Sequence, residues 1–320
     1  MLRIGVLGVG HLGKIHLRCL QELKEQFELV TFFDHQMSAA KEAMELTGLM
    51  PSHSLDHLLE QVDAVVITVP TIAHYKMAMQ AFRQFKHVFI EKPVCSDMEE
   101  ARSLLKLVRE AEVTCQVGHI ERFNPVFIAA MPFISHPSFI ESRRLMPSHH
   151  RGLDVSVILD LMIHDIDLVL KITGAAVRKI TANGSSVFSS LIDVANVRLE
   201  LDNGAVAQLT ASRIHHEAER KMTIYQRDQY LKLDFLEHHL ERVDAAGQAK
   251  GLTHTIKVNS VNAIKEELKS FHESVVRRKE PVVSLEDGLK ALDIALQATS
   301  LSESSTMVGD EHVFSADSEQ

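Results

Sequence analysis

The sequence predicts an α/β protein, in which a doubly wound parallel sheet is followed by an α+β domain with a largely antiparallel, open sheet. Three observations predict this fold class. Strand-like apolar runs alternate with helical segments up to Gly118, strands then follow one another with few helices between them, and the 320 residues exceed the usual size of one domain. We expect a first domain at residues 1–118, a second at 119–301 and a polar, loosely held tail at 302–320.

Short apolar runs and segments with helical apolar spacing take turns along the first domain. The expected strands are residues 3–7, 27–33, 62–69, 87–90 and 113–117, and the expected helices are residues 12–24, 38–46, 73–85 and 97–110. Parallel strands need a long crossover connection, usually a helix, and this alternation supplies one each time. The first domain is therefore predicted to be a parallel sheet covered by helices.

The second domain is predicted to be mainly strands. These strands are residues 139–145, 178–182, 193–201, 205–213, 221–225 and 231–235, with a crossing helix at 156–173 and two closing helices at 261–276 and 285–300. Asp202-Asn203-Gly204 joins two of the strands, and Asn-Gly supplies the positive backbone angles that a tight hairpin needs. We assign substrate binding and oligomerisation to this domain.

The composition is that of a globular protein and excludes several classes. The formal net charge of -9 argues against broad neutralisation of nucleic acid phosphates. No run approaches the length of a membrane span, and the start of the chain has no export signal pattern. Cys19, Cys95 and Cys115 are too scattered for a disulfide framework, and the histidine doublets lack zinc-like spacing. We expect a cytoplasmic protein with no metal site, no membrane partner and no nucleic acid partner.

A glycine turn follows the first expected strand. Gly8, Gly10 and Gly13 form GxGxxG between a strand and a helix, and Asp34 closes the next strand. The first glycine permits a tight turn, the second lets backbone amides approach a pyrophosphate, and the third allows close packing of the helix. Asp34 can accept both ribose hydroxyl hydrogens and would repel a 2′-phosphate. The turn thus predicts a Rossmann domain that binds NAD rather than NADP, with His11 and Leu12 beside the cofactor.

Five segments carry a resemblance to a known family. They are GVGHLG at residues 8–13, TVPTIAH at 68–74, EKP at 91–93, GHIERFNP at 118–125 and DLMIHDID at 160–167. On these segments the sequence resembles the Gfo/Idh/MocA oxidoreductases. The resemblance implies nicotinamide-dependent oxidation of a sugar hydroxyl, with further cofactor contacts from Thr68, Pro70, Thr71, His74, Glu91 and Lys92.

Three residues are candidates for the chemistry. Lys92 follows an apolar strand at the sheet edge where ligands bind, and its ammonium could stabilise a developing alkoxide. Asp160 and His164 share one face of a helix, so the carboxylate can orient the imidazole as a base. An ordinary lysine in a loop and an ordinary Asp–His pair are the alternatives. The resemblance implies that the three act together; Asp165 and Asp167 are second choices with structural roles.

Several arginines could bind a diphosphate, because guanidinium groups offer paired donors. Arg122, Arg143, Arg144 and Arg151 flank the expected site, and neighbours such as Arg143 and Arg144 cannot both point inward from one strand. We assign Arg122, Asn124 and Arg151 to the substrate. His119-Ile120-Glu121 departs from the aromatic-Asn-Arg pattern that is commoner in the family, which favours a specialised substrate.

Within the family, the segments around ERFNP and DLMIHDID look most like those of bacterial dehydrogenases that oxidise the 3-hydroxyl of UDP-N-acetylglucosamine in lipid A synthesis. That likeness implies that a partner aminotransferase converts the ketone to an amine. Two alternatives remain open, namely an inositol or free-sugar dehydrogenase and a non-catalytic nucleotide-sensing regulator with the same fold. We also expect a homodimer or homotetramer, because an uncovered apolar sheet face commonly becomes a symmetric interface.

Overall fold

The computed structural model of the chain describes residues 1–147, 155–245 and 251–314, with burial described through residue 304 in the last range. The chain divides into two compact units. The first unit comprises Met1–Phe123 and Asn262–Leu289, and the second comprises Asn124–Val261 and Lys290–Gln320. Each unit has its own sheet and its own apolar core.

The first unit takes residues from two distant parts of the chain. The sequence places residues 119–301 wholly in the second domain, whereas the structure joins 119–123 and 262–289 to the N-terminal sheet. Helix α8 (Ala263–Arg277) packs on α1 (His11–Glu22), and its Leu268 and Phe271 are fully buried in the core of the first unit. The apolar face of α8 is visible in the sequence, but the core that receives this face is not.

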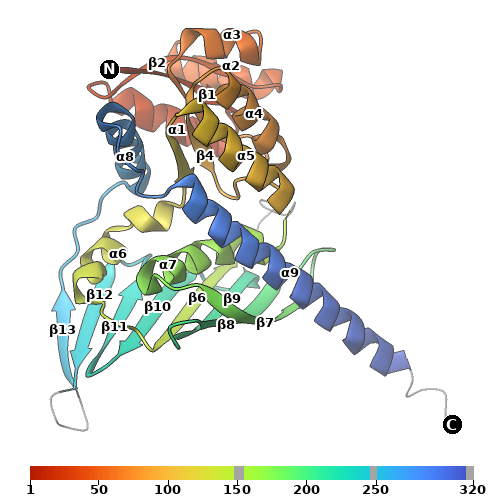
Figure 1. Cartoon of the computed structure of the whole chain (residues 1–320), viewed down its shortest axis with the longest axis vertical. Coiled ribbons are helices and arrows are strands. Elements are labelled where there is room, and N and C mark those ends of the chain that lie inside the picture. Colours follow the sequence, from red (N-terminus) through yellow and green to blue (C-terminus); the bar gives the residue numbers. More distant parts are fainter. Residues whose placement is uncertain (148–154, 246–250, 315–320) are drawn as a thin grey trace. The chain divides into compact units, whose positions relative to one another are not determined.

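The sheet of the first unit is parallel and five-stranded, in the order β2-β1-β3-β4-β5 (Figure 1). Its strands are β1 (Leu2–Leu7), β2 (Phe27–Phe33), β3 (Ala64–Ile67), β4 (His87–Glu91) and β5 (Cys115–Gly118). Besides α1, the helices between them are α2 (Met37–Thr47), α3 (Leu55–Gln61), α4 (Thr71–Arg83) and α5 (Met98–Ala111). The predicted doubly wound sheet is confirmed. Its order reverses between β1 and β3, which makes their carboxyl ends the point where such sheets bind ligands.

The sheet of the second unit has eight strands in the order β13-β12-β11-β10-β6-β9-β8-β7. These strands are β6 (Phe139–Pro147), β7 (Val177–Ser185), β8 (Val194–Leu201), β9 (Val206–His215), β10 (Glu219–Gln226), β11 (Gln229–Asp234), β12 (His239–Asp244) and β13 (Leu252–Ile256). All neighbours pair antiparallel except β6 and β9, which run parallel. The predicted largely antiparallel sheet is confirmed.

Helices cover one face of this second sheet (Figure 1). They are α6 (Pro125–Ala130), α7 (Ile163–Thr173) and the part of α9 (Leu285–Phe314) that belongs to the second unit. The other face carries polar side chains, such as the exposed Arg143, Asn196 and Lys221, because residues alternate along each strand. The expectation of an uncovered apolar face is therefore wrong for these strands.

The turn between β8 and β9 has the residues that the sequence singles out. Gly204 has a φ of +86°, in the left-handed region that glycine adopts without steric cost. Asn203 accepts a hydrogen bond at its Oδ1 from the backbone N–H of Ala205, at 3.0 Å. Only the glycine takes a positive φ, so one such residue, rather than two, closes this hairpin.

Two helices differ from the sequence prediction. The helix expected at 156–173 begins as a π-helical turn, η3 (Ile158–Met162), and continues as α7. The tail expected from Ser302 onward is instead helical as far as Phe314, as the end of α9. Glu303, Met307 and Glu311 of this segment have good helix propensity, although the segment shows little amphipathic periodicity.

Short elements escaped the sequence analysis. They are α3, α6, β12, β13 and the 3₁₀ turns η1 (Ile120–Phe123) and η2 (Met131–Phe133). Such lengths hold too few apolar positions to show a period, and local caps define some of them instead. Ser54, for example, accepts the N–H of His57 at the start of α3, at 3.1 Å.

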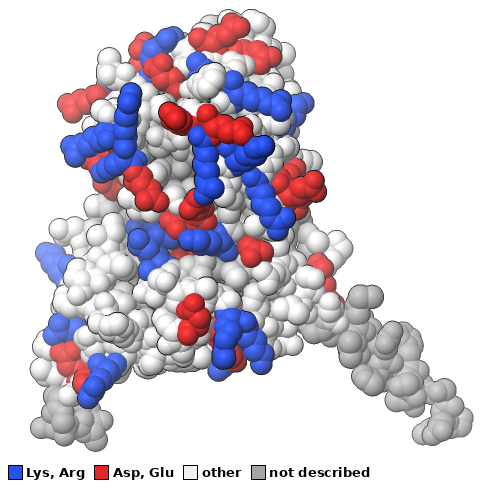
Figure 2. All heavy atoms as spheres, viewed as in Figure 1, with Lys and Arg blue, Asp and Glu red and all other residues white. Residues whose placement is uncertain are grey.

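Among the described residues, none of the helices is both long and apolar enough to cross a membrane. The face shown in Figure 2 mixes Lys and Arg with Asp and Glu. This mixture fits the composition, in which 34 basic residues largely offset 43 acidic ones. Cys19, Cys95 and Cys115 are buried free thiols. Burial raises the pKa of the Cys95 thiol to about 12, so this side chain behaves as an unreactive apolar group.

Asp193 organises the loop between β7 and β8. Its carboxylate accepts three backbone N–H groups, from residues 187–189, at 2.7–3.0 Å, and the hydroxyl of Ser189 at 2.7 Å. The buried Arg213 lies 3.5 Å away. Burial by itself raises the pKa of Asp193, but the hydrogen bonds from Ser189, Phe188 and Val187 outweigh it and lower the pKa to about 2.

This lowered pKa predicts a loss of stability in acid. Because the folded-state pKa of Asp193 lies below its unfolded value, its contribution is present above about pH 4 and is lost as the pH falls towards 2. We expect Asp193→Asn to lower the free energy of unfolding at pH 7 by roughly 2 kcal/mol and to flatten its decline between pH 4 and 2. Urea unfolding at several pH values measures both effects. Asp202→Asn, in the exposed β8–β9 turn, is the control, and an equally steep decline in Asp193→Asn would contradict the assignment.

Candidate active site

The glycine turn joins β1 to α1 and leaves little room for side chains. Gly8 has a φ of +84°, and a Cβ there would lie 2.7 Å from the backbone nitrogen of Val69. A Cβ on Gly13 would lie 2.0 Å from the carbonyl oxygen of Gly8. The start of α1 can approach the end of β1 this closely only without a side chain at these two positions.

Gly10 differs from the other two glycines, because a Cβ there would meet no atom within 4 Å. It is the N-cap of α1, and the first turn of this helix has neither a capping side chain nor an acidic residue. His11 is exposed and Leu12 is half-buried in that turn. Free backbone N–H groups at a helix N-terminus attract anions, and the open approach at Gly10 gives a pyrophosphate access to them. The turn therefore fits a dinucleotide.

Asp34 is fixed beside the glycine turn. It follows β2, and its two carboxylate oxygens accept the backbone N–H groups of Val9, at 2.7 Å, and Gln36, at 2.8 Å. A carboxylate has about four acceptor sites, so these bonds orient the group and leave acceptors for ribose hydroxyls. The position is the one where dinucleotide-binding sheets place their ribose-binding acid.

The segment after β3 lies against the same turn. Thr68 donates its hydroxyl to the carbonyl of Gly8 at 2.6 Å. Pro70 caps α4 and is exposed, and Thr71 is the first residue of that helix. Thr68, Pro70 and Thr71 thus lie at the carboxyl edge of the sheet, next to the glycines.

His74 belongs to the same segment but faces the interior. Its side chain is 2% exposed, and its Nδ1 and Nε2 lie 2.8 Å from the carbonyl oxygens of Pro93 and Val69. Burial lowers its pKa, while the two carbonyl groups act in the opposite direction because they favour a ring that donates from both nitrogens. His74 connects the start of α4 to the loop that carries Lys92, and its ring nitrogens are already occupied by the backbone.

Lys92 and Glu91 lie at the end of β4. Lys92 is half-buried in the loop after the strand. Glu91 is buried, and its Oε1 lies 2.9 Å from the Nε2 of His16 on α1. Since β1, β3 and β4 are parallel neighbours, Lys92 emerges at the same edge as Gly8 and Thr68.

The sequence analysis did not assign His16 or Glu267, which lie beside Glu91. His16 follows the last glycine of GxGxxG by three residues, and Glu267 is on α8. Both are fully or almost fully buried, at 0% and 1% exposure. A polar residue on the buried face of an amphipathic helix is the signal that could have identified each of them.

Asp160 and His164 belong to the second unit, whereas Lys92 belongs to the first. Asp160 is half-buried within the π-helical turn η3, and His164 is 9% exposed in the first turn of α7. The two residues therefore lie on either side of the change from π- to α-helix. Single π-helical turns are rare and occur frequently at functional sites.

The arginines that the sequence assigns near a diphosphate have different surroundings. Arg144 and Asp165 form a buried, two-bonded ion pair, with both N–O distances 2.9 Å, so Arg144 is a structural residue. The exposed Arg143 pairs with Glu219. Arg122 is buried and lies 3.8 Å from Asp287.

Asn124 and Arg151 complete this set. Asn124 caps α6, with its Oδ1 accepting the N–H of Val126 at 3.0 Å, and its Nδ2 lies 3.4 Å from the carbonyl of Phe235. Asn124 thus has a structural role as a helix cap, and its assignment to the substrate stays a prediction. Arg151 lies outside the described residues. Asp167 is buried in α7, in keeping with its expected structural role.

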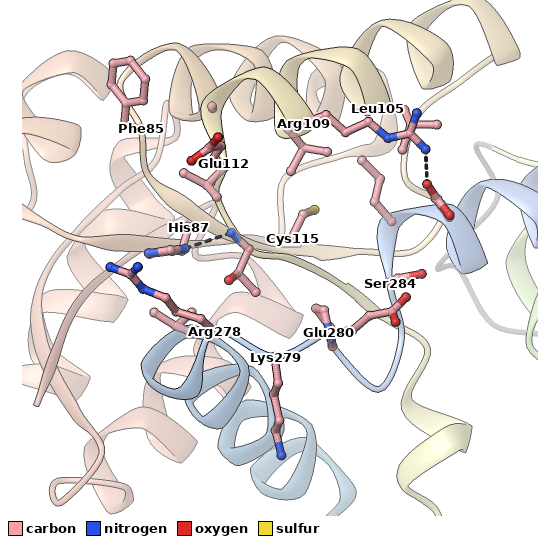
Figure 3. A pocket seen from close by; sticks show the side chains of 18 of the residues that line it. Phe85, His87, Leu105, Arg109, Glu112, Cys115, Arg278, Lys279, Glu280 and Ser284 are labelled. Atoms are coloured by element: carbon pink, nitrogen blue, oxygen red, sulfur yellow. Dashed lines mark hydrogen bonds and ion pairs between the residues drawn. The ribbon is translucent and has the colours of Figure 1, made fainter.

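A pocket of about 920 Å³ opens elsewhere on the first unit (Figure 3). Its lining includes His87 and Cys115, which begin β4 and β5, and Arg109, which pairs with Glu286. His87 accepts the N–H of Thr114 at 2.9 Å. The pocket lies at the amino ends of β4 and β5, whereas the glycine turn and Lys92 lie at the carboxyl edge of the same parallel sheet, so the pocket is separate from the candidate active site.

Comparison with known proteins identifies the family. An oxidoreductase-family model with an NAD-binding Rossmann fold matches residues 2–119, and the Gfo/Idh/MocA C-terminal domain matches residues 138–231. The chain is 34% identical over 303 residues to a UDP-N-acetylglucosamine 3-dehydrogenase of Acidithiobacillus ferrooxidans. The aligned region covers 92% of this chain and 96% of that protein. The chain belongs to the Gfo/Idh/MocA oxidoreductase family. It is therefore a nicotinamide-dependent dehydrogenase.

Other relatives define the breadth of this likeness. The solved structure of the Acidithiobacillus ferrooxidans enzyme matches with a TM-score of 0.89 and 32% identity, covering 95% of this chain and 98% of that chain. A scyllo-inositol 2-dehydrogenase (NAD(+)) of Bacillus subtilis is 26% identical over 93% of this chain and 93% of that protein. The full-length matches show that both units belong to the family fold.

The glycines predict two different effects of adding one methyl group. Gly13→Ala places a Cβ against the carbonyl of Gly8, so we expect it to lower the free energy of unfolding by about 1–3 kcal/mol. Gly10→Ala meets open space, so we expect stability to change by less than about 0.5 kcal/mol while NAD affinity falls about tenfold. Urea unfolding and calorimetric titration with NAD measure the two effects. Unchanged NAD affinity in Gly10→Ala would place the pyrophosphate elsewhere.

Proposed function

We propose that this member of the family oxidises the 3-hydroxyl of UDP-N-acetylglucosamine to a ketone, with NAD as the hydride acceptor. The observation that carries the proposal is the 34% identity, over 92% of the chain, to an enzyme named for that reaction. Both units are included in that match, so the likeness extends to Lys92 and to the segment with Asp160 and His164.

Three side chains of this chain have suitable chemistry for the reaction. The nicotinamide, when bound, supplies the acceptor for the hydride that leaves the sugar carbon. In the proposal, His164 accepts the hydroxyl proton, and Asp160 orients the imidazole. Lys92 donates a hydrogen bond to the reacting oxygen and stabilises its developing negative charge.

The π-helical turn supports the roles of Asp160 and His164. It widens the helix at Asp160, immediately before the turn of α7 that carries His164. An irregular turn interrupts the regular hydrogen-bond ladder, and such insertions persist chiefly where function requires them. A regular helix would have sufficed to pack the apolar side chains of this segment.

Of the four arginines that the sequence suggests for the UDP group, we propose only two as ligands. Arg144 is committed to Asp165, and Arg143 lies on the exposed face of its strand. Arg122 and Arg151 remain the proposed diphosphate ligands. A buried arginine such as Arg122 is well suited, because its donors are already oriented by the protein.

An inositol or free-sugar dehydrogenase is the second candidate. The 26% identity to a scyllo-inositol 2-dehydrogenase, over 93% of each chain, favours it. The same acid–base residues would serve both substrates, so the arginines decide between them. We expect Arg122→Leu or Arg151→Leu to impair use of the nucleotide sugar far more than use of a polyol.

The product and the setting follow from the proposed reaction. A 3-keto sugar is the natural substrate of an aminotransferase, and the resulting amine would carry the amide-linked acyl chains of lipid A. Three buried free thiols are in keeping with a reducing compartment, so we place the protein in the cytoplasm. We propose a homodimer or homotetramer, as is common for enzymes.

The proposed chemistry predicts large losses of turnover. Using NAD reduction at 340 nm with UDP-N-acetylglucosamine, we expect His164→Asn to lower kcat by about 10²- to 10⁴-fold and Lys92→Met by about 10²- to 10³-fold. NAD affinity should stay within about threefold in His164→Asn, because His164 acts only on the sugar. Asp165→Asn is not a suitable control because it breaks a buried ion pair; Asp202→Asn in the β8–β9 turn is.

A panel of UDP-sugars, free sugars and inositols, with the product ketone located by NMR, completes this experiment. Faster turnover of inositol than of UDP-N-acetylglucosamine would favour the second candidate. Full activity of Lys92→Met or His164→Asn on the preferred substrate would overturn the proposed mechanism.

The cofactor preference predicts a separate result. Asp34→Asn keeps an acceptor for the N–H of Val9 or Gln36 but removes the charge that repels a 2′-phosphate. We expect the ratio of kcat/KM for NAD to that for NADP to fall by about tenfold or more, since hydrogen bonds to charged groups contribute about 1.5–3 kcal/mol. Steady-state kinetics with both cofactors measure the ratio. An unchanged ratio would remove Asp34 from the ribose site.

A further inference from the structure

A buried polar cluster in the first unit includes Glu91, the residue that precedes Lys92. It consists of His16 on α1, Glu91 at the end of β4 and Glu267 on α8. One nitrogen or oxygen atom from each of the three lies within 4.8 Å of the others, and their exposed fractions are 0%, 8% and 1%. Polar groups buried this deeply require an explanation, because an apolar residue would cost less.

His16 and Glu91 are hydrogen-bond partners, which accounts for the burial of both. The Nε2 of His16 lies 2.9 Å from Oε1 of Glu91, while its buried Nδ1 has no hydrogen-bond partner. The proton therefore belongs on Nε2, which donates to the carboxylate. Gly118 supplies the space, because a Cβ there would lie 2.7 Å from Oε2 of Glu91. The Glu91 carboxylate is thus bonded by His16 in space that Gly118 leaves open, immediately before Lys92.

Glu267 is the member of the cluster that this pair leaves unexplained. Neither of its carboxyl oxygens has a hydrogen-bond partner among the described residues, although its backbone carbonyl accepts the side chain of Gln116 at 2.7 Å. Burial raises the pKa of Glu267 well above its usual value, and the nearby Glu91 raises it further. Two buried carboxyl groups this close cannot both ionise readily, so Glu267 is the one that keeps its proton at neutral pH.

Among the described residues, charged side chains on α8 and on the turn that packs against it pair with groups other than Glu267. On α8 itself, the half-buried neighbours form ion pairs, with Lys265 bonded to Glu22 of α1 and Lys269 to Glu266. The turn η1, which packs on α8, contributes two charged groups of opposite sign. These are Glu121 and Arg122, and the arginine pairs with Asp287.

We propose that Glu267 is a positioning residue: as a neutral carboxyl group it donates to a water that bridges to Glu91, and together with His16 it fixes the backbone that carries Lys92. This role rests on the proposed function, since it gives the lysine its fixed position. The two carboxyl groups form no direct hydrogen bond, but atoms within 4.8 Å of each other are close enough for one water to accept the O–H of Glu267 and donate to Glu91. A carboxylate held by two donors keeps its orientation, and residues that orient catalytic groups typically matter by 10- to 100-fold, as around metal ligands.

Two substitutions of Glu267 and a matched control test this role. Glu267→Gln is neutral, of equal size and still a donor, so we expect kcat to stay within about threefold of the parent. Glu267→Leu has no donor, so we expect kcat to fall about tenfold or more, with KM for NAD unchanged within about twofold. Glu266→Gln, on the half-buried neighbouring position that pairs with Lys269 at the surface, should change neither value. The proposal would be overturned if kcat of Glu267→Gln fell as far as that of Glu267→Leu, or if Glu267→Leu retained full kcat.

Infrared spectroscopy tests the protonation state without any substrate. A protonated carboxyl group gives a carbonyl band distinct from that of carboxylates. We expect this band at pH 7 in the parent protein and in Glu266→Gln, and its loss in Glu267→Gln. Its absence from the parent protein would overturn the proposal even if no sugar is oxidised, so the two failures can be told apart. One equivalent of a divalent metal in the purified protein would also overturn it, because the carboxyl group would then be an ionised ligand.

Discussion

The close approach of α1 to the end of β1 is the constraint on which the candidate active site depends. With no Cβ on Gly13, the helix begins against the carbonyl of Gly8, and its free N–H groups face the open space at Gly10. The same packing brings His16, one turn further along, under the end of β4. One steric condition therefore places both the anion-binding helix end and the polar residue that holds Glu91.

Hydrogen bonds from side chains to the backbone then connect the loops of this sheet edge. Asp34 holds the glycine turn, Thr68 holds the carbonyl of Gly8, and His74 ties the start of α4 to Pro93. Each bond joins two loops that leave different strands, so the edge is fixed as one surface. Such fixation matters in an enzyme that works mainly by placing a cofactor and a substrate, because misplaced groups lose rate rapidly.

Arg144 and Asn124 show that the fold can give a side chain a structural partner that its residue type does not reveal. Arg144 is well suited to a diphosphate, yet the structure uses it in a buried pair with Asp165, where losing one partner would leave a buried charge. Asn124 lies within a family-like segment but caps α6. Residue chemistry indicates what a side chain is able to bind, whereas its partners in the fold decide what it does bind.

The sequence by itself determined the fold class, the positions of most strands along the chain and the glycine turn. These depend on local periodicity and on the steric needs of single residues. It also determined the family, through segments that are each local. Tertiary structure decided that α8 completes the first unit, that a π-turn precedes His164, and that Glu267 faces Glu91. Those outcomes depend on contacts between residues up to 251 positions apart, as for His16 and Glu267, and pairing over such distances leaves no periodic signal in the chain.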